Sequence, residues 1–136
     1  MIRREDIVDV LLSASPGYRV RWDQFRGSTD FDANLIYVHL GDFADFVVDL
    51  LERHELEGMH AIAVGLERLH VEGDEFVKEA ATIGLLEGIQ NIASNRRVAT
   101  TGLEEALGVE TRRWWNSLRA FWSGRSPYVG ADITKR

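Results

Sequence analysis

Residues 74–95 read DEFVKEAATIGLLEGIQNIASN, and this stretch decides the fold that the chain can adopt. On a helix, apolar side chains would cover most of the circumference, leaving only a narrow polar strip at Glu75, Lys78, Glu79 and Thr82. A helix that is apolar nearly all round is packed by other helices on several sides. The stretch therefore predicts an all-α protein in which this long helix is buried.

Three polar residues interrupt the apolar face of that helix. Glu87, Gln90 and Asn91 fall at helical spacing beside apolar residues such as Ala80 and Ile83. An unpaired carboxylate or amide in a protein interior costs free energy, so buried groups of this kind have hydrogen-bond partners. The spacing predicts that the three residues form a structural polar network between helices. The alternative is a site in which Glu87 acts as a general acid or base.

Apolar residues at three- and four-residue spacing mark the other helices. Helices are expected over residues 3–13, 37–54, 56–71, 101–108 and 110–123. Asp74 can cap the long helix by accepting from its first free amides, and Thr101 with Glu104 has the spacing of a capping box. Between the first two helices the chain is less regular: Trp22 and Phe25 share one helical turn, and the residues from 27 to 34 are typical of a loop.

The last helix is rich in aromatic residues. Trp115, Leu118 and Trp122 form one apolar stripe, flanked by Trp114 and Phe121, and the cluster is predicted to belong mostly to the core. Two adjacent tryptophans on a helix cannot point the same way. One of Trp114 and Trp115 is therefore expected nearer the surface, where tryptophan can contribute to an interface.

These elements predict a single helical domain over residues 1–136, folded as an irregular bundle of five to six helices. The expected helices 37–54 and 56–71 resemble one antiparallel pair. HEAT-like pairs therefore stay open as the internal arrangement, although no fixed repeat period is present. Residues 124–136 lack periodicity and are expected either to form a mobile tail or to lie back on the body.

Composition narrows the classes of function. The net charge of −6 argues against general nucleic-acid binding, which needs a basic surface, and suits a basic protein partner. The absence of cysteine excludes disulfides, thiolate zinc sites and cysteine nucleophiles. The start of the chain has too short an apolar run for a signal peptide, and no stretch approaches the roughly 20 apolar residues of a membrane span. A cytoplasmic protein is expected.

An acidic stripe lies at helical spacing on the expected helix 37–54. It consists of Asp42, Asp45, Asp49 and Glu52, and no lysine interrupts it. Like charges at these spacings repel one another, so such a face is either solvated or docks a basic partner. The second interpretation makes these four carboxylates the candidate partner-binding residues.

Metal chemistry is suggested by two Glu-x-x-His pairs, Glu57 with His60 and Glu67 with His70. In carboxylate-bridged metal bundles such pairs come from different helices. Here both lie on one expected helix, so no metal site and no cofactor is predicted. A site made by Glu67, His70 and Glu87 stays open if the helices that carry them pack face to face. No glycine-rich phosphate loop or Gly-x-Ser-x-Gly elbow is present, and no catalytic residue is predicted.

Four phrases resemble a family of small bacterial helical proteins similar to immunity proteins of polymorphic toxin systems. They are LGDFADFVVDLLE at 40–52, GLERLHVEGDEFV at 65–77, IGLLEGIQNIAS at 83–94 and RRWWNSLRAFW at 112–122. The resemblance implies a toxin-neutralising protein without enzymatic activity, which binds its cognate toxin in a stoichiometric complex. The alternatives are a HEAT-like adaptor or self-associating structural protein, and a metal-dependent helical-bundle enzyme.

Overall fold

The computed structural model describes residues 1–125 and 127–131. Over these residues the protein is all-α, as predicted, and β-type pairing is limited to an isolated parallel bridge between Ile2 and Gly73. The helices are α1 Ile7–Ala14, α2 Arg19–Arg26, α3 Ile36–Glu52, α4 Met59–Glu72, α5 Glu75–Glu79, α6 Glu87–Arg96, α7 Thr101–Glu104 and α8 Val109–Trp122, with 3-10 turns η1 Arg4–Asp6 and η2 Pro16–Tyr18 and a π-helical segment η3 Ala80–Leu86.

The long central helix is built from α5, η3 and α6, which follow one another without a break. Asp74 caps its start, because the Asp74 carboxylate accepts a hydrogen bond from the Val77 N–H at 2.9 Å. The helix ends where Arg97 adopts a left-handed conformation with φ of 57°. The helix and its N-cap are therefore as predicted, whereas the π-helical segment in its middle is not visible in the residue pattern.

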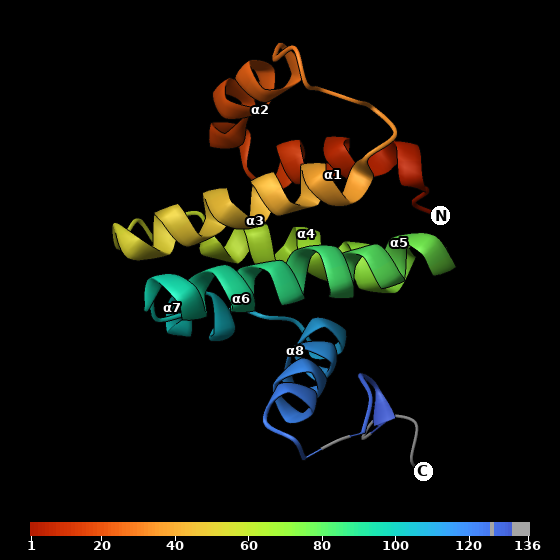
Figure 1. Ribbon diagram of the computed structural model, residues 1–136, viewed down its shortest axis with the longest axis vertical. Helices are drawn as coiled ribbons and strands as arrows, with labels where there is room; N and C mark the ends of the chain where they lie inside the picture. Colours follow the sequence, from red (N-terminus) through yellow and green to blue (C-terminus); the bar gives the residue numbers. More distant parts are fainter. Residues whose placement is uncertain (126, 132–136) are drawn as a thin grey trace.

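The long helix packs chiefly against α3, and the two run in the same direction (Figure 1). Behind them α4 runs the opposite way; it packs against α1 on one side and α8 on another. The chain neighbours α3 and α4 are thus antiparallel, as expected, but they do not pack closely against each other. Residues such as Phe43, Val47, Leu66, Leu85 and Ile89 are fully buried where these layers meet.

Two details near the end of the chain differ from expectation. The N-cap of α7 is Thr100, not Thr101, and the Thr100 hydroxyl donates to the Glu104 carboxylate at 2.5 Å. In α8, Trp115 is buried as expected, but Trp122 is 59% exposed. Trp122 lies in the last turn of α8, which extends away from the central layers (Figure 1).

Part of the expected tail lies against α8. Gly124 ends this helix with φ of 80°, as glycine at this position commonly does. Further on, the Gly130 N–H donates to the Ser117 hydroxyl at 2.6 Å, and Val129 packs against the core. The segment 127–131 therefore returns to the body, while residues 126 and 132–136 lie outside the described residues.

Close contact of α1 with α4 depends on Gly65. A Cβ on Gly65 would lie 2.7 Å from the Ala14 Cβ, so Gly65→Ala would force the two helices apart. We expect it to lower the free energy of unfolding by about 1–2 kcal/mol, as overpacking does. Gly41→Ala in α3 is the matched control, because a Cβ there meets nothing within 4 Å. It should be neutral or stabilising by up to about 1 kcal/mol. Urea denaturation measures both, and equal effects would contradict the prediction.

Candidate functional site

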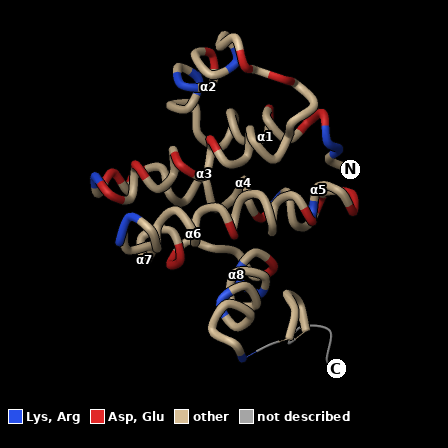
Figure 2. Tube along the Cα trace, in the orientation of Figure 1, with Lys and Arg blue, Asp and Glu red and all other residues tan. Residues whose placement is uncertain are grey.

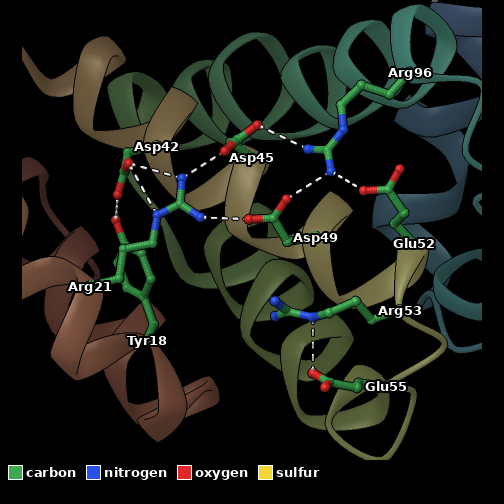
Figure 3. Close-up of polar contacts among 9 residues, drawn as sticks. All are labelled: Tyr18, Arg21, Asp42, Asp45, Asp49, Glu52, Arg53, Glu55 and Arg96. Carbon is green, nitrogen blue, oxygen red and sulfur yellow. Dashed lines mark hydrogen bonds and ion pairs between the residues drawn. The ribbon is translucent and has the colours of Figure 1, made fainter.

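The acidic stripe lies where α2, α3 and α6 meet (Figure 3). From α2, the Arg21 guanidinium contacts three of its members: Nη2 lies 3.2 Å from Asp42 and 2.7 Å from Asp45, and Nη1 lies 2.9 Å from Asp49. The Tyr18 hydroxyl adds a further bond to the stripe by donating to Asp42 at 2.5 Å. The stripe therefore binds α2 to the face of α3.

A second arginine reaches the stripe from the end of the long helix. Arg96 Nη1 lies 3.2 Å from Asp45, and Arg96 Nη2 lies 2.8 Å from Asp49 and also pairs with Glu52. Two arginines thus alternate with four carboxylates in one ladder. Arginine suits such a ladder because its planar guanidinium offers five N–H donors.

The ladder shifts the ionisation of its members. Burial by itself would raise the pKa of Asp49, but hydrogen bonds from Arg96 and Arg21 outweigh it and hold that pKa below its usual range. Burial likewise opposes the charge of Arg21, yet its carboxylate partners raise its pKa. Burial and the bond to Asp42 raise the pKa of Tyr18 far above normal. Asp49 and Arg21 are therefore both charged at neutral pH, and their ion pair is formed there.

The stripe, which was expected to be solvated or to dock a basic partner, pairs with two arginines of the same chain. The side chains of Asp42 and Asp49 are only 17% and 29% exposed, and arginines from α2 and α6 neutralise them. Pairing of this kind depends on the tertiary fold, since Arg96 lies 51 residues from Asp45 along the chain. Glu52, which is 51% exposed, is the most accessible member of the stripe. Partner binding by the stripe stays a prediction, but each of its carboxylates already pairs with an arginine within the chain.

Glu67 joins α4 to the start of α8. Its carboxylate accepts from the backbone N–H groups of Glu110 and Thr111 at 3.1 and 2.9 Å, and from the Thr111 hydroxyl at 2.7 Å. The N-cap of α8 is Gly108, which has no side chain to do this. Burial would raise the pKa of Glu67, but the bonds from Thr111 and Glu110 outweigh it and lower that pKa. Glu67 therefore caps α8 from another helix.

His70 lies beside this cap and is buried. Its Nδ1 is 2.8 Å from the Leu66 carbonyl oxygen and 3.2 Å from the Thr111 hydroxyl, and its Nε2 is 3.1 Å from the Thr82 hydroxyl. Because the Leu66 oxygen can only accept, Nδ1 carries the proton and Nε2 accepts from Thr82. Burial lowers the pKa of His70 despite its bond to Leu66 and the nearby charge of Glu67. A neutral imidazole with both nitrogens paired is a structural histidine.

The metal site that the sequence left open does not form among the described residues, which contain no group of three or more metal-binding side chains. Glu67 and His70 do meet, but through Thr111, and Glu87 makes no hydrogen bond with either. The second expected pair does not add to them: Glu57 and His60 are both exposed.

The predicted network of Glu87, Gln90 and Asn91 is wrong as a buried cluster. Asn91 is exposed, and Glu87 is half-buried. Only Gln90 acts as foreseen, donating to the Trp115 carbonyl oxygen at 3.1 Å. The π-helical segment η3 precedes these residues, and its i→i+5 bonds place more residues in each turn than an α-helix does. Residues after η3 therefore do not lie on the helix face that α-helical spacing assigns to them.

Acid should destabilise the fold in two stages. His70 has a pKa below its ordinary 6.5, so the unfolded chain binds its proton first and stability falls as the pH drops below 6.5. Glu67 and Asp49 also have lowered pKa values, and the stability they contribute is lost as the pH falls from 4.5 and 3.8 through their folded values. Each group contributes a slope of up to about 1.4 kcal/mol per pH unit.

Urea denaturation from neutral pH down to about pH 3 measures both stages. In His70→Gln the upper stage should vanish while the lower stage remains, whatever the absolute stability of the variant. If wild type and His70→Gln lost stability equally between pH 6.5 and 4.5, the pKa of His70 would not be lowered by folding.

A surface that the sequence did not predict lies at the other end of α3. Exposed apolar side chains gather there in a shallow depression of about 290 Å³, which Arg4 also lines. We call these the apolar patch: Leu35, Tyr37, Val38 and Phe76, with exposed fractions of 50%, 41%, 54% and 36%. The rings of Tyr37 and Phe76 are 6.4 Å apart and nearly perpendicular, so α3 and α5 share the patch.

Phe76 also lines a larger groove of about 620 Å³ between α5, η3 and α8. Phe76, Ile83, Trp114 and Val129 supply its apolar lining. Polar groups from α5 border it, including Glu75 and Glu79, and we call it the α5–α8 groove. The patch and the groove meet at Phe76, and together they form the candidate binding surface of the described residues.

A family described as a domain of unknown function, DUF7674, matches residues 8–123, which is most of the chain. The chain belongs to the DUF7674 family. The match runs from α1 to the end of α8 and so includes the ladder, the Glu67 cap and the groove apart from Val129. No curated protein and no solved structure matches the chain.

The description of DUF7674 states no activity, so the implied immunity function stays a prediction. No helix among the described residues has the length and apolar character needed to cross a membrane.

Proposed function

We propose that this DUF7674 protein binds a cognate protein toxin in a stoichiometric complex and neutralises it, as an immunity protein does. The observation that carries the proposal is the apolar patch. Contiguous exposed apolar side chains on a protein surface mark interaction sites. Tyr37 and Phe76 are aromatic, the residue class enriched among dominant interface contacts.

The scaffold supports this role because the surface is held rigidly. Leu40, directly below the patch on α3, is fully buried. Gly84 lets the two helices approach closely, since a Cβ there would meet Leu40 at 2.6 Å and Tyr37 at 3.3 Å. A surface fixed in its bound shape loses little conformational entropy on binding. The four sequence phrases favour a toxin as the class of partner, and the net charge of −6 suits a basic one.

Co-expression with the toxin-like product of the neighbouring gene tests the proposal. The DUF7674 protein should restore growth and co-purify with that product in a complex of defined stoichiometry. A catalytic inactivator would protect at substoichiometric amounts, so protection must saturate when the two proteins reach equal concentrations. Failure to bind the product, or protection far below equivalence, would overturn the proposal.

A further inference from the structure

We propose that the α5–α8 groove, with the adjoining apolar patch, receives a partner segment that combines apolar side chains with lysine or arginine. This inference rests on the proposed function and identifies the surface and the chemistry of the partner. It places the docking site away from the acidic stripe, whose four carboxylates each pair with Arg21 or Arg96 within the fold.

The apolar half of the proposal comes from the lining of the groove. Phe76 and Trp114 stand on different helices, α5 and α8, and both line the groove. The Trp114 indole N–H donates to Glu110 at 3.3 Å, which leaves its ring as apolar surface. Removal of such rings from water by a partner's aliphatic side chains is favourable, because it buries apolar surface.

The lysine or arginine of the partner is inferred from carboxylates of the groove that form no ion pair within the described residues. Glu75 and Glu79 are exposed on successive turns of α5, and neither forms an ion pair in the described part of the chain. Glu79 also lies close to the apolar patch. Burial raises the pKa of Tyr37, and the negative charge of Glu79 raises that pKa further. Figure 2 marks acidic residues along α5, and of these Glu75 and Glu79 line the groove. The patch also holds a cation, because the Arg4 guanidinium lies 5.3 Å from the centroid of the Phe76 ring.

The other charged groups around the groove do not cancel this excess. Glu110 is already paired with Arg113 at 3.1 Å. Lys78 also lines the groove, but the two exposed carboxylates of Glu75 and Glu79 outnumber its single positive charge. His70 is neutral because burial lowers its pKa. A segment with cationic groups beside apolar ones fits this lining, whereas an acidic segment would bring its charge against α5.

A synthetic amphipathic helix of leucine and lysine is a suitable probe, and the same helix with glutamate in place of lysine is its control. Binding to the full chain is measured by anisotropy of the labelled peptide. We expect the lysine peptide to bind and the glutamate peptide not to bind. Glu75→Lys with Glu79→Lys, and separately Phe76→Ser, should each weaken binding by about tenfold or more.

Two matched variants separate the groove from the rest of the acidic surface. Glu57→Lys with Glu105→Lys changes the net charge equally at exposed residues outside the groove. Trp122→Ser removes an exposed aromatic side chain elsewhere. Both should keep the affinity within about twofold. If Glu57→Lys with Glu105→Lys weakened binding as much as Glu75→Lys with Glu79→Lys, the basic peptide would be attracted to the acidic protein in general. Binding at the groove would then be wrong.

The oligomeric state tests a competing occupant. If the purified protein forms a dimer that Phe76→Ser dissociates, a second copy occupies the surface and the proposal fails. Failure of the peptide titration leaves the co-expression result untouched, so the two proposals fall separately. Equal neutralisation of a toxin by wild type and by Phe76→Ser would contradict docking at the groove and would leave the proposed function intact.

Discussion

Reversing two charges of the acidic stripe, Asp45→Lys together with Asp49→Lys, is expected to lower the free energy of unfolding by about 3 kcal/mol. Both carboxylates contact Arg21 and Arg96, at distances between 2.7 and 3.2 Å. The variant would place two lysines against two half-buried arginines and leave those arginines without their partners. Urea and thermal denaturation measure the loss, and α2 should detach first because Arg21 and Tyr18 join it to α3.

The control is Glu75→Lys with Glu79→Lys, which changes the net charge by the same amount. These glutamates are exposed and form no ion pair within the described residues, so the variant should stay within about 1 kcal/mol of wild type. If both double variants were equally stable, the ladder would be no more than a set of solvated surface pairs, which are worth little.

The stability difference decides how binding data on the stripe are to be interpreted. A partner that binds the Asp45→Lys, Asp49→Lys variant weakly would be responding to a damaged scaffold as well as to an altered charge. Glu52→Lys is the better probe of docking at the stripe, because this residue is half-exposed and, among the described residues, pairs with Arg96 alone. Its affinity for a basic partner can be compared with that of the groove variants at equal stability.

Local patterns were enough to predict most of the fold. The long helix with its Asp74 cap, the buried stripe of α3 and the burial of Trp115 all depend on residues within a few turns of one another. Spacing and capping chemistry act over that range. The π-helical segment changes the phase of the helix from within, and periodicity alone cannot reveal it. For that reason Glu87 and Asn91 were placed on the wrong face.

The ladder and the Glu67 cap could not be predicted because their partners are far apart along the chain. Arg21 and Arg96 pair with a stripe on α3 from two other helices, and no local signal in the stripe indicates which arginines will do so. The start of α8 does carry a signal in its sequence. Gly108 cannot accept hydrogen bonds through a side chain, so the free amides after it need an acceptor from elsewhere. Glu67 is that acceptor, and not a metal ligand.

Removal of this acceptor tests the cap. Glu67→Ala would leave three donors without a partner: the N–H groups of Glu110 and Thr111, and the hydroxyl of Thr111. Thr111 is fully buried, so water cannot replace the carboxylate without rearrangement. We expect a loss of about 2–3 kcal/mol, the usual cost of orphaned buried donors. Urea denaturation measures it, and Glu57→Ala at an exposed position of the same residue type serves as the control.

Glu67→Gln separates hydrogen bonding from charge. The amide keeps one carbonyl oxygen that can accept from Thr111, but it loses the negative charge that favours a helix N-terminus. It should therefore cost only about 1 kcal/mol. Hydrogen exchange adds a local measurement: the amides of Glu110 and Thr111 should exchange faster in Glu67→Ala than in Glu67→Gln, while amides in α3 are protected equally in both. Identical stability and exchange in the two variants would show that Glu67 acts through its charge alone, and the cap would then be no more than an interaction with the helix dipole.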